Sequence, residues 1–171
     1  MNRSNLWLLH FYTIAETVIL LWFFGNIIVQ ARIRGLIHLL MIVFPIGCIL
    51  NVWLFQKANV FNSNARSAEA LIFIFLSACY WLEDNDGPNS ASWVDNPANW
   101  MVSGLILYFA SDFLLFLFSN RLLADAQAKH DYTVWYLVWG IHGTMVLLMY
   151  LLIAVGFFTI KPDRKGEYFF K

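Results

Sequence analysis

Five long apolar runs constrain this chain most strongly, because a helix needs about 20 apolar residues to cross a bilayer. The runs cover about residues 6–29, 35–55, 65–82, 98–118 and 133–160. Lipid cannot satisfy the hydrogen-bonding groups of an open strand, so each run must form a helix. The sequence therefore predicts an all-α fold, a polytopic transmembrane bundle of five helices. It would form a single membrane domain over residues 1–171, with a short tail at 161–171.

The composition leaves little chain for a separate soluble domain. Charged residues make up 13% of the sequence and hydrophobic residues 60%, whereas a soluble domain has about 25% charged residues. The formal net charge is zero, so no nucleic-acid partner is expected. The expected partners are the lipid bilayer, a partner's membrane helices or a second copy of the chain, and a small-molecule ligand.

Local signals mark some of the helix ends. Asn96 followed by Pro97 is typical of an N-cap and the first position of a helix, and predicts the start of the fourth span. Asn64 is the predicted N-cap of the third span, and Pro162 is predicted to end the fifth.

The basic residues favour one orientation in the membrane. The N-terminus and the 2–3 and 4–5 connections share one side, here called the start side. Lys and Arg are almost equally divided between the two sides, but the densest clusters, Arg32–Arg34 and the tail after Ile160, lie on the other side. The positive-inside rule then favours an N-terminus outside and a cytoplasmic C-terminus.

Several ionisable side chains interrupt the spans, where each costs several kcal/mol unless it is buried against partners. At 1.5 Å per residue, all of them except His38 fall in the start-side half of the bilayer. Helical spacing also places polar residues on narrow stripes of the first, third and fourth helices, which should face one another. The sequence predicts a polar pocket formed by His10, Glu16, Asn51, Arg66, Glu69, Tyr108, Asp112 and His142. The alternative is that these groups are interhelical packing contacts, each contributing less than about 1 kcal/mol.

The same residues argue against several reactions. No span contains a lysine for a retinal Schiff base, and no Glu-x-x-His motif for a di-iron centre occurs. The histidines differ in depth, which disfavours a bis-histidine haem. No serine lies in a G-x-S-x-G setting. We therefore predict no catalytic residue, no metal site and no cofactor, and a protein that is not an enzyme.

Four stretches, residues 10–16, 61–69, 96–104 and 139–143, carry a resemblance over nearly the whole chain. They resemble an uncharacterised family of Gram-negative bacterial multi-pass membrane proteins, related to the membrane modules of some sensor histidine kinases. Fuller members of that family have seven helices, two of them before the helix of His10. The resemblance implies a cytoplasmic C-terminus, since a kinase fused there must reach ATP, and a pocket on the periplasmic side. It also implies motif positions for His10, Glu16, Asn64, Arg66, Glu69 and His142.

The leading hypothesis is an integral inner-membrane protein that acts as a non-enzymatic sensory, signalling or scaffold module with a polar intramembrane pocket. The alternative is a small transporter or proton-coupled membrane subunit, in which Glu16, Asp112 and His142 relay protons.

Overall fold

The computed structural model describes residues 6–56, 60–84 and 92–160, and in this part of the chain it confirms the all-helical prediction. No strand occurs among the described residues. The elements are α1 (Leu6–Ile27), α2 (Ala31–Leu54), α3 (Ser63–Asp84), the short 3-10 helix η1 (Trp93–Asp95), α4 (Pro97–Lys129) and α5 (Thr133–Thr159). Each of the five α-helices is long and apolar enough to cross a membrane.

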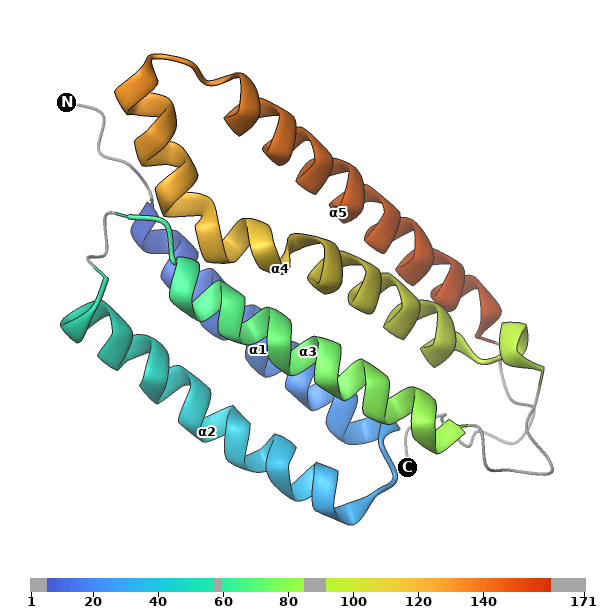
Figure 1. The fold of residues 1–171 in the computed structure, drawn as a ribbon. Coiled ribbons are helices and arrows are strands. Elements are labelled where there is room, and N and C mark those ends of the chain that lie inside the picture. Colours follow the sequence, from blue (N-terminus) through green and yellow to red (C-terminus); the bar gives the residue numbers. More distant parts are fainter. Residues whose placement is uncertain (1–5, 57–59, 85–91, 161–171) are drawn as a thin grey trace.

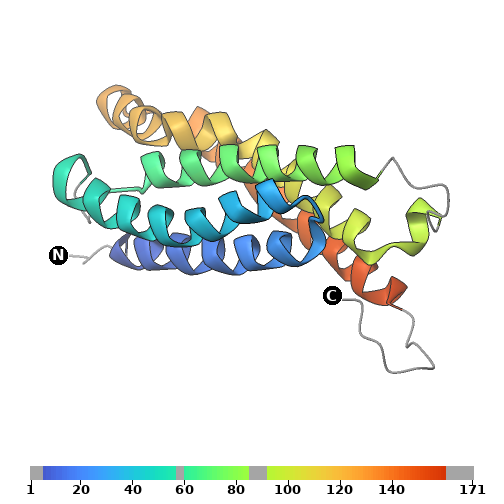
Figure 2. The same ribbon diagram turned by 90° about the horizontal axis from the view of Figure 1, so that it is seen from below.

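The five helices alternate in direction (Figure 1), and their contacts divide them into two groups. One group is the pair α1 and α2, and the other is formed by α3, α4 and α5, with α4 in the middle; contacts between the groups are fewer and run from α3 to α1 and α2. Figure 2 shows that α4 and α5 are inclined to the other three helices. The protein therefore has a seam between its two groups of helices.

Aromatic packing holds α1, α3 and α4 together. The ring of Phe73 on α3 lies 5.7 Å from that of Phe24 on α1 and 5.0 Å from that of Phe109 on α4, measured between centroids. All three side chains are fully buried. In lipid, such close contact rather than escape from water is what holds helices together.

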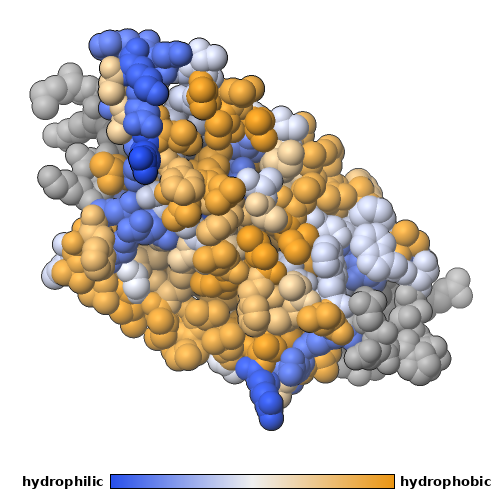
Figure 3. Space-filling view, in the orientation of Figure 1, coloured by the Kyte–Doolittle hydropathy of each residue, from blue (hydrophilic) through white to orange (hydrophobic). Residues whose placement is uncertain are grey.

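Large apolar side chains cover the outside of the bundle, as expected for a multi-pass membrane protein. Figure 3 shows them over the middle of one face, with most hydrophilic residues near its ends. The five spans differ in burial: half of the α3 span is buried, against 11% of the α5 span. Helix α3 is therefore central, and α5 lies at the periphery.

The helix ends agree with some local signals and correct others. Asn96 is the N-cap of α4 as predicted, since its side chain accepts a hydrogen bond from the Ala98 backbone N at 3.0 Å. Asn64 is not an N-cap, because α3 already begins at Ser63. Helix α5 ends at Thr159, and Pro162 lies outside the described residues.

Helix α4 continues to Lys129, well past the predicted end at Phe118. The added segment contains Ala, Leu, Arg, Gln and Lys, which favour helix in water as well as in lipid. It ends where His130 adopts a left-handed conformation, φ 52°, and donates its backbone N–H to the carbonyls of Ala126 and Gln127. The prediction was wrong here because hydropathy locates the membrane boundary and not the end of the helix.

Candidate functional site

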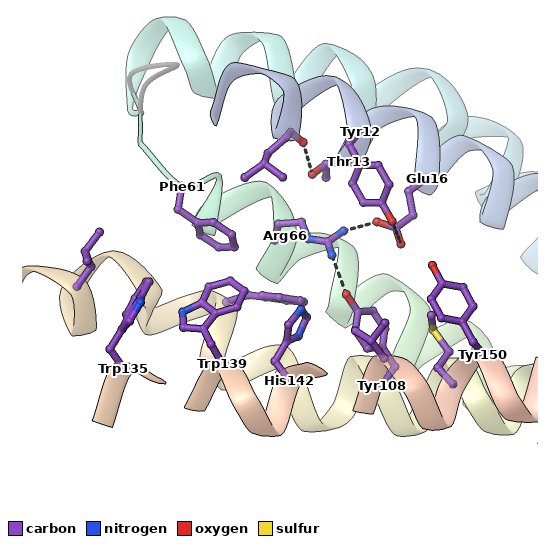
Figure 4. Close-up of a pocket in the computed structure, with 15 residues that line it drawn as sticks. Tyr12, Thr13, Glu16, Phe61, Arg66, Tyr108, Trp135, Trp139, His142 and Tyr150 are labelled. Atoms are coloured by element: carbon purple, nitrogen blue, oxygen red, sulfur yellow. Dashed lines mark hydrogen bonds and ion pairs between the residues drawn. The ribbon is translucent and has the colours of Figure 1, made fainter. Parts of the chain in front are cut away.

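A cavity of about 470 Å³ lies among α1, α3, α4 and α5 in the start-side half of the bundle (Figure 4). On α5 its lining extends from Trp135, near the start of the helix, to Tyr150. At 1.5 Å per residue this is roughly 22 Å along the helix axis. The cavity therefore extends from near the start-side end of the helices to the middle of the span.

Arg66, near the beginning of α3, is the central polar group of the cavity wall. Its guanidinium pairs with the carboxylate of Glu16 on α1, and donates at 2.7 Å to Glu69 on its own helix and at 2.7 Å to the hydroxyl of Tyr108 on α4. The ring of Phe116 lies 4.7 Å from the guanidinium carbon, which allows a cation–π contact. One side chain therefore joins three helices.

The two carboxylates beside Arg66 differ in exposure. Glu69 is fully buried and also accepts a hydrogen bond from the Thr17 hydroxyl at 2.6 Å. The Glu16 side chain is 15% exposed and lines the cavity, where its second oxygen accepts a longer hydrogen bond of 3.2 Å from Tyr12. Glu69 thus binds Arg66 on the side away from the cavity, whereas Glu16 faces the cavity.

A second polar pair joins α4 and α5. Nδ1 of His142 lies 2.7 Å from a carboxylate oxygen of Asp112. His142 lines the main cavity, while Asp112 is buried and lines a second hollow of about 410 Å³ on the α4–α5 side, together with Ser111 and Phe118. The pair therefore connects two separate hollows.

Six of the eight predicted site residues lie at this cavity. Glu16, Arg66, Tyr108 and His142 line it. Glu69 and Asp112 do not line it, but each is bonded to a residue that does.

The two remaining predicted residues, His10 and Asn51, lie elsewhere. His10 is buried beside the backbone of Val60 and is not part of the lining. It lies about 120° around α1 from Glu16 at 100° per residue, so the two ends of the polar arc face different neighbours. Asn51 is near the end of α2, which does not border the cavity, and it bonds to the side chains of Gln56 and Asn64.

The sequence does not predict the aromatic walls of the cavity. The rings of Tyr12, Phe61, Tyr108, Phe116, Trp135, Trp139 and Tyr150 line the cavity, and Tyr108 alone was predicted. A signal exists on α5, where residues 135, 139, 142, 146, 149 and 150 recur every three to four positions, the period of one helix face. In a membrane span such a stripe resembles ordinary lipid-facing or packing residues, so it does not single out a cavity.

No family model, curated protein or solved structure matches this chain. Among residues 6–56, 60–84 and 92–160, no three His, Cys, Asp or Glu side chains lie close enough to hold a metal ion. The arrangement is a cavity with aromatic walls and a few fixed polar groups, features that small-molecule sites share.

Proposed function

We propose that this protein is an inner-membrane sensory module that binds a small molecule in the cavity and does not transform it. The observation that carries the proposal is the position of Arg66 at the seam between the two groups of helices. Through Glu16 the guanidinium holds α1, and through Glu69 and Tyr108 it holds α3 and α4. A ligand at this point would contact the interaction that joins the two groups.

The walls of the cavity belong to both groups. Tyr12 and Glu16 come from α1, while Trp139, His142 and Tyr150 come from α5. A ligand that binds one relative position of α1 and α5 better than another shifts the population toward that position, which is the requirement for a sensor. Small displacements of packed helices are an established form of such a switch.

We place the cavity on the periplasmic side, with the N-terminus periplasmic and the C-terminus cytoplasmic. Two arguments support this orientation. The basic clusters around Arg32 and after Ile160 favour the cytoplasm, and the resemblance to sensor-kinase membrane modules implies a cytoplasmic C-terminus. The same resemblance supports a sensory role over an enzymatic one.

A ligand screen with a blocked cavity tests the proposal. The full chain, in lipid nanodiscs, is heated with a library of small organic molecules, and the shift in melting temperature is measured. Val146 lines the cavity, so Val146→Trp should fill part of it. Val155 is on the same helix but exposed on the outside, so Val155→Trp is the matched control.

We expect some compounds to raise the melting temperature of the wild type and of Val155→Trp by several degrees but to have little effect on Val146→Trp. A ligand that binds the native state but not the unfolded state stabilises the protein by mass action, and this stabilisation is lost when the binding site is blocked. If no compound separates the two tryptophan variants, the polar groups are structural contacts and the proposal fails.

A small transporter or proton-coupled subunit is the second candidate, and one observation favours it. His142 and Asp112 form a hydrogen-bonded pair between two hollows, which is the arrangement of one step in a proton relay. Compounds found in the screen should therefore be tested for uptake into proteoliposomes with and without a pH gradient. Uptake that is lost in Asp112→Asn would assign transport, whereas binding without uptake supports the sensor.

A further inference from the structure

The polar network in and behind the cavity wall has more acidic than basic side chains. Two carboxylates, Glu16 and Glu69, share the single guanidinium of Arg66. The other pair, Asp112 with His142, has a formal charge of minus one when the histidine is neutral. Unpaired negative charge inside a membrane is costly, so this region favours a positive counter-charge.

The free acceptor is on Glu16. One of its oxygens pairs with Arg66, and the other accepts only the 3.2 Å hydrogen bond from Tyr12 among the interactions of the described residues. In Figure 4 Glu16, Tyr12 and Tyr150 lie around the same part of the cavity. By contrast, the donors of Arg66 already serve three partners. A ligand anion would compete with two carboxylates for Arg66, whereas a ligand cation finds a carboxylate oxygen ready to accept.

The walls suit a cation as well. Seven aromatic residues line the cavity, and their π-faces attract positive charge when water is excluded. Two of them already lie near a cation, since the guanidinium carbon of Arg66 is 4.7 Å from the Phe116 centroid and 5.7 Å from that of Tyr12. A volume of about 470 Å³ is within the range of small-molecule sites.

We infer that the cavity binds an organic cation, an amine or quaternary ammonium that carries an apolar group, with its positive centre beside Glu16 and Tyr150 and its apolar part directed along the aromatic lining toward Trp139. The inference rests on the proposed function, because it names the class of ligand for the same cavity. It deepens that proposal by excluding carboxylates, phosphates and neutral lipids as the favoured ligands.

Three probes of similar shape distinguish the effect of the ligand's charge from the effect of its size and shape. Benzyltrimethylammonium is a cation, neopentylbenzene is its neutral carbon isostere, and benzylsulfonate is an anion of comparable size. Binding to the full chain in nanodiscs of zwitterionic lipid is measured by the change in tryptophan fluorescence, since Trp135 and Trp139 line the cavity. Empty nanodiscs give the partition into lipid, which is subtracted.

We expect the cation to bind the wild type at least about tenfold more tightly than the neutral isostere, the order expected of a charge-assisted contact. The anion should not bind measurably. Glu16→Gln removes the charge but keeps the shape, and should reduce the cation's affinity to that of the isostere. Glu83→Gln is the matched control, because Glu83 is bonded to the backbone of Val29 and Gln30, outside the cavity lining, and it should leave all three affinities unchanged.

A second variant keeps the test decisive if Glu16→Gln lowers the folded fraction. Tyr150 lines the cavity on the same side as Glu16 (Figure 4). Tyr150→Leu leaves the ion pairs in place and removes an aromatic ring beside the expected position of the charge, so it should weaken cation binding about tenfold while the neutral isostere loses less. Equal binding of cation and isostere, preference for the anion, or no binding of any probe would overturn the inference. If compounds from the library still distinguish Val146→Trp from Val155→Trp in that case, the proposed function survives and only the ligand class is wrong.

Discussion

The two halves of the bundle are built differently from the same helices. In the start-side half, α1, α3 and α4 surround a cavity and are joined by the polar contacts of Arg66. Further along, the same three helices meet through the closely packed rings of Phe24, Phe73 and Phe109. The difference teaches that close apolar packing in one half of the bundle can fix the relative positions of the helices, so that the other half can contain a cavity.

The start-side half can contain a cavity because long polar side chains join its helices across a distance. Apolar side chains join helices only by direct contact, which leaves no space between them. Long side chains such as Arg66 and Glu16 reach across from different helices. Charged groups inside a membrane must nevertheless be paired with one another. Each member of the network therefore depends on the others, and this dependence can be measured.

Removing Arg66 should have the largest effect. Arg66→Met leaves the buried Glu69 and the partly buried Glu16 without their shared cation, and breaking a buried ion pair from one side costs about 3–5 kcal/mol. Stability is measured from unfolding in increasing SDS, followed by far-UV circular dichroism in mixed micelles. Arg34→Met is the control, since Arg34 is exposed near the start of α2, and it should change stability by less than about 0.5 kcal/mol.

Two further substitutions should restore part of the stability that Arg66→Met loses. Changing Glu16 and Glu69 to Gln in the Arg66→Met chain removes the unpaired charge, and should recover a large part of the loss. A loss of less than about 1 kcal/mol in Arg66→Met would mean that the network adds little to the start-side half, and the comparison of the two halves would fail.

The five spans could be predicted from the sequence because the requirement is so general. Any chain segment that crosses lipid needs about 20 apolar residues in a helix, and the runs in this sequence are unambiguous. The extension of α4 to Lys129 could not be predicted in this way. Its last residues are polar and continue the helix beyond the apolar run, where hydropathy gives no signal.

Removing the ring of Phe73 tests the packed half and should have the next largest effect. Phe73→Ala deletes a fully buried ring between Phe24 and Phe109 and leaves a gap that neighbouring side chains fill only in part. The cavity alone should cost about 2–3 kcal/mol, because the transfer from water that adds to this cost in a soluble core is absent in lipid. Phe75→Ala on the exposed side of the same helix should cost less than about 1 kcal/mol. SDS titration gives both values.

Binding measured on the same variant sharpens the comparison. Phe73 does not line the cavity, and Phe73→Ala leaves every lining side chain in place, so the affinity for benzyltrimethylammonium should stay within about twofold of the wild type. A large loss of affinity would show that the packed half also sets the shape of the cavity, and that the halves are not separate in function.

Apart from Tyr108, which was found on a polar stripe of its helix, the site was predictable only where a residue is costly in lipid. Glu16, Arg66, Asp112 and His142 attract attention because an ionisable group in a span must have a reason to be there. The sequence does not show which partner each will meet, since that depends on how each helix is rotated. The aromatic walls give no such signal, because Trp139 or Phe116 is equally suited to lipid, to packing and to a cavity.

The close contact between α4 and α5 gives the smallest and most local test. A Cβ added at Gly156 would lie 2.9 Å from the carbonyl oxygen of Pro97 and 2.9 Å from Cγ of Met101, whereas one added at Gly140 would meet nothing within 4 Å. Gly156→Ala should therefore push the helices apart at a cost of about 1–3 kcal/mol. Gly140→Ala should be neutral or slightly stabilising, since alanine favours helix over glycine by up to about 1 kcal/mol. Both are measured by SDS titration; if Gly156→Ala is as stable as Gly140→Ala, the end of the bundle opposite the cavity is not tightly packed and the contrast between the halves is lost.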